Sequence, residues 1–174
     1  MGHIFFIADT HFGEDAIRRY ENRPFADVSS MDDALVANWN RTVSNEDTVI
    51  HLGDFAAHGT ERRLLTQLHG RKLLVRGNHD DKSNAFYRDA GFDEVYDFPI
   101  LYGGFFLLSH EPLYVNENMP YANLFGHVHN SPLFRTCSRR HYCVCVERIG
   151  YTPISFEAIR AALQQAENTQ TDAQ

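Results

Sequence analysis

The arrangement of short apolar runs, each ending at a polar residue, is the feature that most constrains how this chain can fold. Runs with the sequences HIFFIAD, DTVIHLGD and KLLVRGN occupy residues 3–9, 47–54 and 72–78. Their length and composition predict buried strands. Helical patterns separate them, and strands that alternate with helices favour an α/β layered domain. Because loops converge beyond the carboxyl ends of strands in such sheets, the polar residues that end these runs are expected to meet at one rim.

The helical segments carry their own start signals. Ser30 is expected to cap a helix that begins directly after it, and Thr60 is expected to cap the next one. The last helix is predicted over residues 155–166, with its first residue as the cap. Residues 167–174, with the sequence ENTQTDAQ, are predicted to be a polar, disordered tail.

From residue 92 onward the pattern changes to short strands separated by Gly, Pro and Asn turns. These runs have the sequences DEVYDFPIL, GFFLLSH, NLFGHVH and YCVCVER. No repeat or linker interrupts the chain, so residues 1–166 are expected to form one domain with a mixed sheet system. A chain of 174 residues is long enough to bury a full hydrophobic core.

The overall charge bears on the class of partner. The formal net charge is -7 and the pI is near 5.7. Proteins that bind nucleic-acid backbones usually present a basic surface, so nucleic acid is not a favoured partner, although bound cations would add positive charge locally. The longest apolar runs, IFFIA and FFLL, are far shorter than the roughly 20 residues that a membrane span needs.

The N-terminus and the cysteines indicate the compartment. The sequence MGHIFF has no basic lead and no small-residue cleavage site, so a secretory signal is not expected. The chain has 3 cysteines, Cys137, Cys143 and Cys145, two of them alternating in an apolar strand. This odd count favours core or half-buried thiols in a reducing compartment over a cysteine metal cluster. We therefore expect a cytoplasmic protein.

Side chains that can bind metals stand at the ends of the predicted strands. In chain order they are Asp9, His11, Asp54, Asn78, His79, Asp80, His110, His127 and His129. Five of the chain's 10 histidines belong to this set. Imidazoles and carboxylates together suit divalent transition metals such as manganese, iron, zinc or nickel.

Each short motif alone has an ordinary structural explanation. A lone D-x-H is more often a surface turn, and a lone G-D or G-N is more often a turn in which Gly and Asn adopt positive φ. His127 and His129 would share one face if their strand continued to Asn130. Only the joint pattern, with ligand-type residues at several strand ends, predicts a metal site.

The order of these motifs resembles that of the calcineurin-like metallophosphoesterases. The series is D-x-H, G-D, G-N-H-D, H and G-H-x-H, and it covers residues 9–129. The chain is also similar to a small bacterial and phage-type subgroup, on the segments NRPF, NWN, HLGDF, SHEPL and YTPISFEAI. The resemblance implies the four-layer metallophosphoesterase fold, an α/β architecture with a central β-sandwich of mixed sheets flanked by helices.

The resemblance also implies a centre of two divalent metal ions, with manganese expected first and iron, zinc, nickel or cobalt as alternatives. The implied ligands of one metal are Asp9, His11 and His129, those of the other are Asn78, His110 and His127, and Asp54 bridges the two. Two divalent cations bring four positive charges, whereas two aspartates and a bridging hydroxide return three negative charges. Such a site stays net positive and attracts phosphate.

The implied reaction is the hydrolysis of a phosphomonoester or phosphodiester. A metal-bridging hydroxide is expected to attack phosphorus in line with the leaving oxygen. His79 is the adjacent imidazole that the ligand set leaves over, and it is expected to act as the general acid; a structural role is the alternative. Asp80 is expected to orient this imidazole, with Asp9 and Asp81 as alternatives.

Fewer signals identify the groups that bind substrate. Asn78 and Arg23 are the predicted substrate-binding residues. Arg23 lies in the loop after the first strand, and a guanidinium suits phosphate; a solvated loop arginine is the alternative. A further basic group, which forms either a lip of the site or a solvated turn, consists of Arg135, Arg139 and Arg140. Glu14 departs from the resemblance, which suggests His at this position, so its role stays open.

Three functions therefore compete. The first is a metal-dependent phosphatase or phosphodiesterase acting on a small phosphoester or a nucleotide. The second is a nuclease with the same chemistry, which the acidic pI and the absence of an added DNA-binding domain disfavour. The third is a non-catalytic scaffold with this fold. A scaffold would be expected to lack some ligands or the G-N-H histidine, yet all of them are present here. The oligomeric state is left open.

Overall fold

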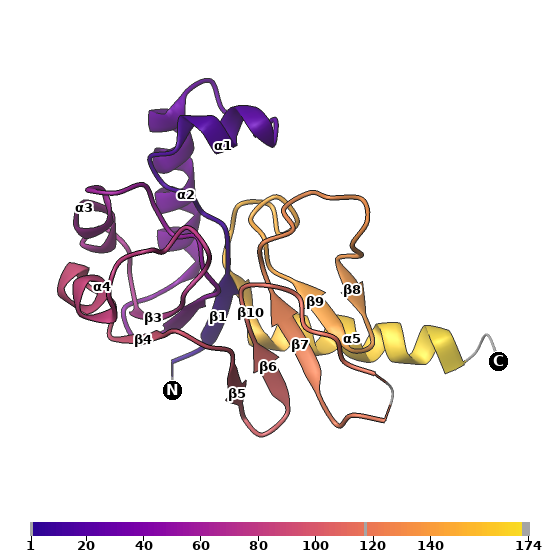
Figure 1. The fold of residues 1–174 in the computed structure, drawn as a ribbon. Helices are drawn as coiled ribbons and strands as arrows, with labels where there is room; N and C mark the ends of the chain where they lie inside the picture. Colours follow the sequence, from indigo (N-terminus) through magenta and orange to yellow (C-terminus); the bar gives the residue numbers. More distant parts are fainter. Residues whose placement is uncertain (1, 117, 172–174) are drawn as a thin grey trace.

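Two five-stranded sheets lie face to face in the computed structural model, which describes residues 2–116 and 118–171 (Figure 1). The strands are β1 (Ile4–Ile7), β2 (Thr48–His51), β3 (Arg71–Val75), β4 (Glu94–Tyr96), β5 (Ile100–Tyr102), β6 (Phe106–Leu108), β7 (Ala122–Phe125), β8 (Cys137–Ser138), β9 (His141–Cys143) and β10 (Ile154–Ser155). The helices are α1 (Asp15–Tyr20), α2 (Val28–Thr42), α3 (Glu61–Leu65), α4 (Asn84–Ala90) and α5 (Phe156–Thr171).

The strand order shows that both sheets are mixed. The first sheet has the order β10-β1-β2-β3-β4, in which β1 to β4 are parallel and β10 is antiparallel to β1. The second has the order β5-β6-β7-β9-β8, with parallel pairs in the centre and antiparallel pairs at both edges. The three apolar runs are the central strands of the first sheet. The expected β-sandwich of mixed sheets flanked by helices is therefore confirmed.

Alternating side chains of the first sheet fill two separate cores, because successive residues of a strand point to opposite faces. Phe6 and Ile50 face the second sheet, where they pack in one core with Leu124. Phe5 and Val49 belong to the other core, which lies under α2, α3 and α4. Truncation of a fully buried residue of either core to Ala is expected to cost about 2–5 kcal/mol.

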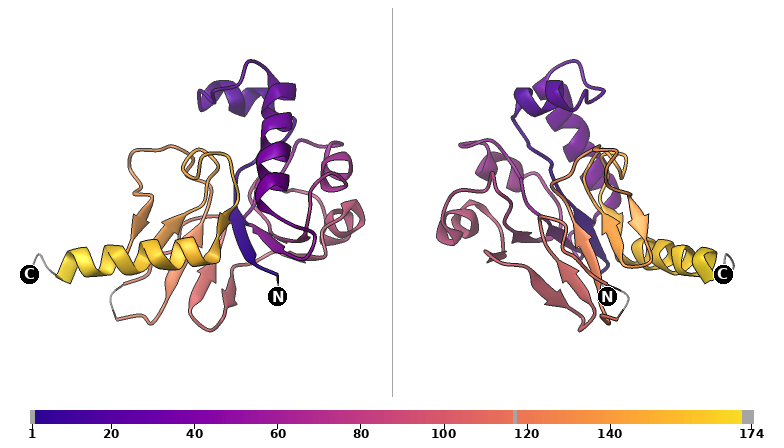
Figure 2. Two further views of the ribbon diagram at one scale, coloured as in Figure 1. Left: turned by 180° about the vertical axis from the view of Figure 1, so that it is seen from behind. Right: turned by 45° about the vertical axis from the view of Figure 1, so that its right-hand side comes forward.

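Helix α5 closes the sandwich core at one side. It contributes Ile159 and Leu163, both buried, to the core between the sheets. Figure 2 shows α5 extending along the second sheet, at the opposite side of the molecule from α3 and α4. Within residues 2–116 and 118–171, no helix combines the length and apolar character that a membrane crossing requires.

The helix boundaries correct three expectations. Helix α2 begins earlier than expected, with Asp27 as its N-cap. The Asp27 side chain accepts from the Ser30 backbone N–H at 2.8 Å, and Ser30 occupies the N3 position of this capping box. Thr60 occupies the N-cap position of α3, as predicted, but its hydroxyl donates to the Ala57 carbonyl and makes no capping hydrogen bond. Helix α5 runs to Thr171, so residues 167–171 of the predicted tail are helical, and 172–174 lie outside the described residues. The Ser155 hydroxyl accepts from the Ala158 N–H at α5, as predicted.

A short bridge joins the two sheets at one end. Ala8, directly after β1, pairs with Cys145, two residues beyond β9. Its N–H donates to the Val144 carbonyl at 2.9 Å, and its carbonyl accepts from the Val146 N–H at 3.1 Å. Cys143 and Cys145 are buried free thiols, as expected of core cysteines. The bridge brings the loops at the carboxyl ends of β1 and β9 together.

Candidate metal centre

The predicted ligands come from loops of both sheets. They follow β1 (Asp9, His11), β2 (Asp54), β3 (Asn78), β6 (His110) and β7 (His127, His129). The structure brings six of these side chains into two groups, in each of which the ligand atoms lie within 4.8 Å of one another. The groups are Asp9, His11, His129 and Asp54, His110, His127. The division matches the two implied ligand sets, and the binding of metal by these atoms stays a prediction.

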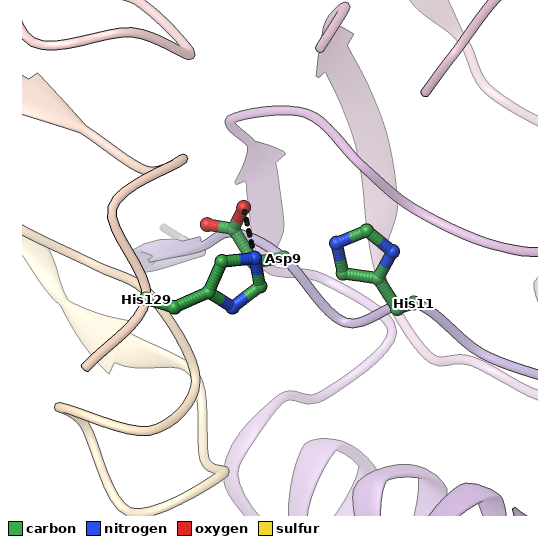
Figure 3. A group of neighbouring side chains, drawn as sticks. All are labelled: Asp9, His11 and His129. Carbon is green, nitrogen blue, oxygen red and sulfur yellow. Dashed lines mark ion pairs between the residues drawn. The ribbon is translucent and has the colours of Figure 1, made fainter. Parts of the chain in front are cut away.

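The first group surrounds the Asp9 carboxylate. Nε2 of His129 lies 3.7 Å from Oδ1 of Asp9, and the rings of His11 and His129 stack with centroids 5.3 Å apart. Figure 3 shows the His129 ring beside the Asp9 carboxylate, while the His11 ring, which comes from the same loop as Asp9, lies across from the His129 ring. Nε2 of His11 is buried and has no hydrogen-bond partner among the described residues. Since a buried polar atom without a partner is costly, this nitrogen fits a metal ligand.

The second group centres on two imidazoles and an amide. Nε2 of His110 lies 3.1 Å from Nδ1 of His127, and Oδ1 of Asn78 lies 3.0 Å from the former and 2.9 Å from the latter. Asp54 adjoins both groups, because its Oδ2 is 3.3 Å from His110 Nε2 and 3.5 Å from His11 Nε2. This is the position that a bridging carboxylate would occupy.

Hydrogen bonds at Nδ1 fix how three of the histidines present their rings. Nδ1 of His11 faces Oε2 of Glu14 at 2.9 Å, and Nδ1 of His110 faces the Leu52 carbonyl at 2.8 Å. His129 makes the same kind of contact, with its Nδ1 3.0 Å from Glu147 Oε1. A proton on Nδ1 leaves the Nε2 lone pair free to bind metal, and such partners orient metal-binding histidines in many sites.

The charges of the centre perturb its titration. Burial raises the pKa of Asp9, although neighbouring histidines oppose the shift. For His110, burial lowers the pKa, but the hydrogen bond to Asp54 and the two carboxylate charges outweigh it and raise the pKa to about 9. Burial acts against ionisation of Asp54, yet the same hydrogen bond holds its pKa below the ordinary value. The negative charges of the carboxylates are thus balanced by protonated imidazoles, and a bound cation could replace those protons.

Backbone conformation distinguishes these ligands from ordinary loop residues. Seven non-glycine residues within 2–116 and 118–171 have positive φ, and five of them are in the two groups: Asp9, His11, Asp54, His127 and His129. Residues other than Gly rarely adopt this region, and such strain concentrates at functional sites. Strand β7 ends at Phe125, so the expectation that His127 and His129 share a strand face is wrong. Left-handed turns orient them instead.

Two glycines permit the close approach of the loops. A Cβ atom at Gly77 would lie 2.2 Å from Oδ1 of Asp54, and one at Gly126 would lie 2.5 Å from Oδ2 of Asp9. Any side chain at these positions would overlap a predicted ligand. The G-N and G-H steps of the sequence therefore serve packing against the carboxylates rather than turn formation alone.

His79 lies at the exposed edge of the first group. Its backbone N–H donates to Oδ1 of Asp54 at 2.9 Å. Its ring meets the His11 ring edge-on, with the centroids 5.1 Å apart. The residue is exposed. A bound substrate could therefore reach its imidazole.

Asp80 does not orient His79 as expected. Its buried carboxylate accepts from the backbone N–H groups of Asp54, Phe55 and Gly77, at 2.8 to 3.1 Å. It therefore stabilises the turn that carries Asp54. The proposed alternative Asp81 pairs with His58 and Lys82, and the other alternative, Asp9, accepts from the His127 N–H. Close to the His79 ring lies the carboxylate of Glu14, which is also within 4.8 Å of His11.

Arg23 is not placed to bind a substrate, which corrects its predicted role. Its side chain is fully buried, and it donates to the carbonyls of Asp9 at 2.7 Å and Thr10 at 2.8 Å. It also pairs with Glu147, a residue 124 positions away that the sequence did not indicate. In the predicted basic group that follows His129, Arg135 is exposed and Arg140 donates to the Tyr121 carbonyl at 3.4 Å.

Comparison with known families decides what kind of protein carries this centre. A model of the calcineurin-like phosphoesterase family matches residues 2–158. The chain belongs to this family. An uncharacterized protein of Methanocaldococcus jannaschii is 33% identical over 181 residues, covering 98% of this chain and 97% of that protein.

Two further relatives of this calcineurin-like phosphoesterase support the assignment, and one of them is a phage protein. The gene 66 protein of Mycobacterium phage D29 is 36% identical over 95 residues, which cover 52% of this chain and 46% of that protein. A protein of unknown function from Aquifex aeolicus has a crystal structure that matches with a TM-score of 0.72 at 30% identity, over 92% of this chain and 99% of that one. The predicted family, subgroup and fold class are confirmed.

Proposed function

We propose that this calcineurin-like phosphoesterase is a dinuclear metal-dependent hydrolase of phosphoesters, acting as a phosphatase or phosphodiesterase. The observation that carries the proposal is the position of Asp54 between two groups of ligand atoms. One carboxylate shared by two imidazole-rich groups suits a pair of adjacent divalent cations. Asp9, His11 and His129 would hold one cation, Asn78, His110 and His127 the other, and Asp54 both.

The donor set limits which cations fit. Imidazoles with carboxylate and amide oxygens suit manganese, iron, zinc, nickel and cobalt, and we propose manganese first. Such cations would supply a Lewis acid for the phosphoryl oxygens and a water activated as nucleophile. Five of the proposed ligand residues adopt positive φ, a strained backbone conformation that concentrates at functional sites.

His79 is the side chain that we propose as general acid. Its N–H donates to Asp54, which fixes the backbone of His79 beside the centre, while its ring stays exposed. An imidazole there can give a proton to the leaving oxygen of a substrate and so avoid the release of an alkoxide. Glu14 lies close enough to hold this ring in position.

The surroundings of the centre favour a small substrate. A cavity of about 250 Å³ adjoins Asn78 and His110, and a second of about 500 Å³ adjoins His127. Volumes of this order suit small-molecule ligands. Because the net charge of the chain is -7, a small phosphoester or a nucleotide suits this surface better than a long nucleic acid does.

Hydrolysis of two chromogenic esters tests the proposal. The protein is freed of metal, reloaded with manganese, and assayed with p-nitrophenyl phosphate and bis-p-nitrophenyl phosphate. Turnover is expected with at least one ester, should stop with chelator, and should be absent in Asp54→Ala. Absence of turnover with manganese, iron, zinc, nickel and cobalt alike would refute the proposed function. The ratio of the two rates then separates monoesterase from diesterase activity.

A further inference from the structure

We infer that Glu147 and Arg23 form a buried positioning pair that preorganises one of the two metal-ligand groups, Asp9, His11 and His129, and not the other. The inference rests on the cation centre of the proposed function, but not on the hydrolysis of any ester. The sequence suggested Arg23 for substrate and gave no role to Glu147. The contacts of the two side chains assign both to the same task.

Burial makes the pair specific rather than incidental. The Arg23 side chain is 0% exposed and that of Glu147 is 4% exposed. Nη2 of Arg23 lies 2.7 Å and Nε 2.9 Å from Oε1 of Glu147. A guanidinium keeps its charge in proteins, so a buried arginine needs a partner of opposite charge. Loss of either residue would leave the other charge buried without that partner.

The arginine half of the pair holds the backbone of the first ligand loop. Nη2 of Arg23 donates to the Asp9 carbonyl and Nη1 to the Thr10 carbonyl. These carbonyls lie in the segment where Asp9 and His11 adopt φ of 59° and 46°. Strained conformations persist only where the surroundings enforce them, and the guanidinium contacts two consecutive peptide groups of this segment.

The glutamate half orients a ring from the other sheet. Oε1 of Glu147 faces Nδ1 of His129 at 3.0 Å, so a proton on Nδ1 leaves Nε2 directed at Asp9. A carboxylate on the far nitrogen also makes an imidazole a stronger ligand. Through one ion pair, the Asp9–His11 loop and the His129 ring are held in a common frame.

The second group is supported in a different way. Nδ1 of His110 faces the Leu52 carbonyl, and Asp80 binds the backbone of the Asp54 turn. Among the contacts described for residues 2–116 and 118–171, none joins Arg23 or Glu147 by a hydrogen bond or ion pair to a side chain of the second group. The two cation sites are therefore expected to respond unequally to loss of the pair.

Manganese binding in two single-site backgrounds tests this inequality. His110→Ala removes a ligand of the second group, and His11→Ala removes one of the first. Glu147→Gln is introduced into each, and the dissociation constant of Mn²⁺ is measured by titration calorimetry. In the His110→Ala background we expect binding about 10–100-fold weaker, the usual effect of losing a partner of a ligand. In the His11→Ala background the change should stay within about 2-fold.

A neighbouring carboxylate supplies the matched control. Glu21 also lies within 4.8 Å of His129, but no hydrogen bond is described between them. Glu21→Gln should leave Mn²⁺ affinity within about 2-fold in both backgrounds. Equal losses in both backgrounds on Glu147→Gln, or a Glu21→Gln effect as large, would overturn the inference, since a general change of charge or fold would then explain the data.

A measurement on the unaltered protein keeps the inference testable even if Glu147→Gln does not fold. In the metal-free protein, ¹⁵N NMR of neutral His129 should report the proton on Nδ1. A proton found on Nε2 contradicts the inference. The tests of this inference measure Mn²⁺ affinity and the His129 proton, not turnover, so failure of the inference can be told apart from failure of the proposed function. Unequal Mn²⁺ losses without any hydrolysis would refute the proposed function alone, whereas equal losses with normal hydrolysis would refute this inference alone.

Discussion

Nε2 of His110 and Nδ1 of His127 lie 3.1 Å apart, closer than two ring nitrogens remain unless a proton or a cation lies between them. Nδ1 of His110 is directed at the Leu52 carbonyl, so the ring presents Nε2 to its neighbour. The Asn78 amide oxygen completes the cluster, at 3.0 Å or less from both nitrogens. Three atoms that can serve as metal ligands therefore converge on one point.

Protons and Mn²⁺ should compete for the ring nitrogens of the centre. Addition of Mn²⁺ to the metal-free protein is expected to release protons, and affinity should rise with pH, because the cation displaces protons from ring nitrogens. Calorimetric titrations in two buffers of different ionisation enthalpy measure the number released. At 100 times the dissociation constant, each cation should stabilise the fold by about 2.7 kcal/mol, visible as a lower Tm with chelator. A Tm that chelator leaves unchanged would contradict this prediction.

Substitution of His79 should impair catalysis, whereas substitution of Asp54 should impair metal binding. His79→Ala is expected to keep its metal and lose about 10²–10⁴-fold in kcat, as expected for loss of a general acid. Asp54→Ala should instead lose bound metal, since the carboxylate adjoins both ligand groups. Metal content by mass spectrometry and kcat on the same samples check both outcomes. If His79→Ala also empties the centre, the histidine is a ligand and not the acid.

Gly77→Ala should disable the centre through shape alone. The added Cβ would approach Oδ1 of Asp54 to 2.2 Å and its backbone N to 2.7 Å, and a backbone atom cannot move away cheaply. We expect a loss of about 1–3 kcal/mol in the free energy of unfolding, together with weaker Mn²⁺ binding. Gly104→Ala is the control, because Gly104 also lies in a loop but nothing lies within 4 Å of its Cβ position. The control should be destabilised only by its positive φ and should bind metal normally.

Acid stability should depend on Asp47. The backbone N–H groups of Ser44 and His3 donate to this carboxylate and hold its pKa below the ordinary value of 3.8. A lowered pKa means that the stabilisation is present above 3.8 and is lost as the pH falls through the folded-state value. Asp47→Asn should therefore cost about 1 kcal/mol at neutral pH and reduce the fall in stability below pH of about 4. Urea unfolding across this range would show parallel curves if Asp47 is not responsible.

The strand ends could be predicted from the sequence because their cause is local. Apolar runs such as residues 47–54 show both the strand and the carboxylate that ends it, and parallel strands bring such ends to one rim. The same reasoning failed at His127 and His129, where the alternation of a strand was extended past Phe125. The chain there turns into a left-handed conformation, which no periodicity encodes.

The supporting contacts could not be predicted because they depend on distant parts of the chain. Arg23 meets Glu147 across 124 positions, and only the closed sandwich brings them together. Asp80 was assigned to its neighbour His79, but its carboxylate reaches back to the turn after β2. Adjacency in sequence was a poor guide in both cases, since a buried charge takes its partners from whichever backbone groups the fold leaves open.

The bridge between Ala8 and Cys145 makes the centre a property of the whole assembled chain. One sheet supplies Asp9 and Asp54, and the other supplies His110 and His129, so neither sheet alone offers a complete ligand group. A chain that has formed only its first half would carry carboxylates without enough imidazoles to retain a transition metal. Cation capture would then mark the moment at which the two halves dock, and a metal-sensitive probe could time the last stage of folding.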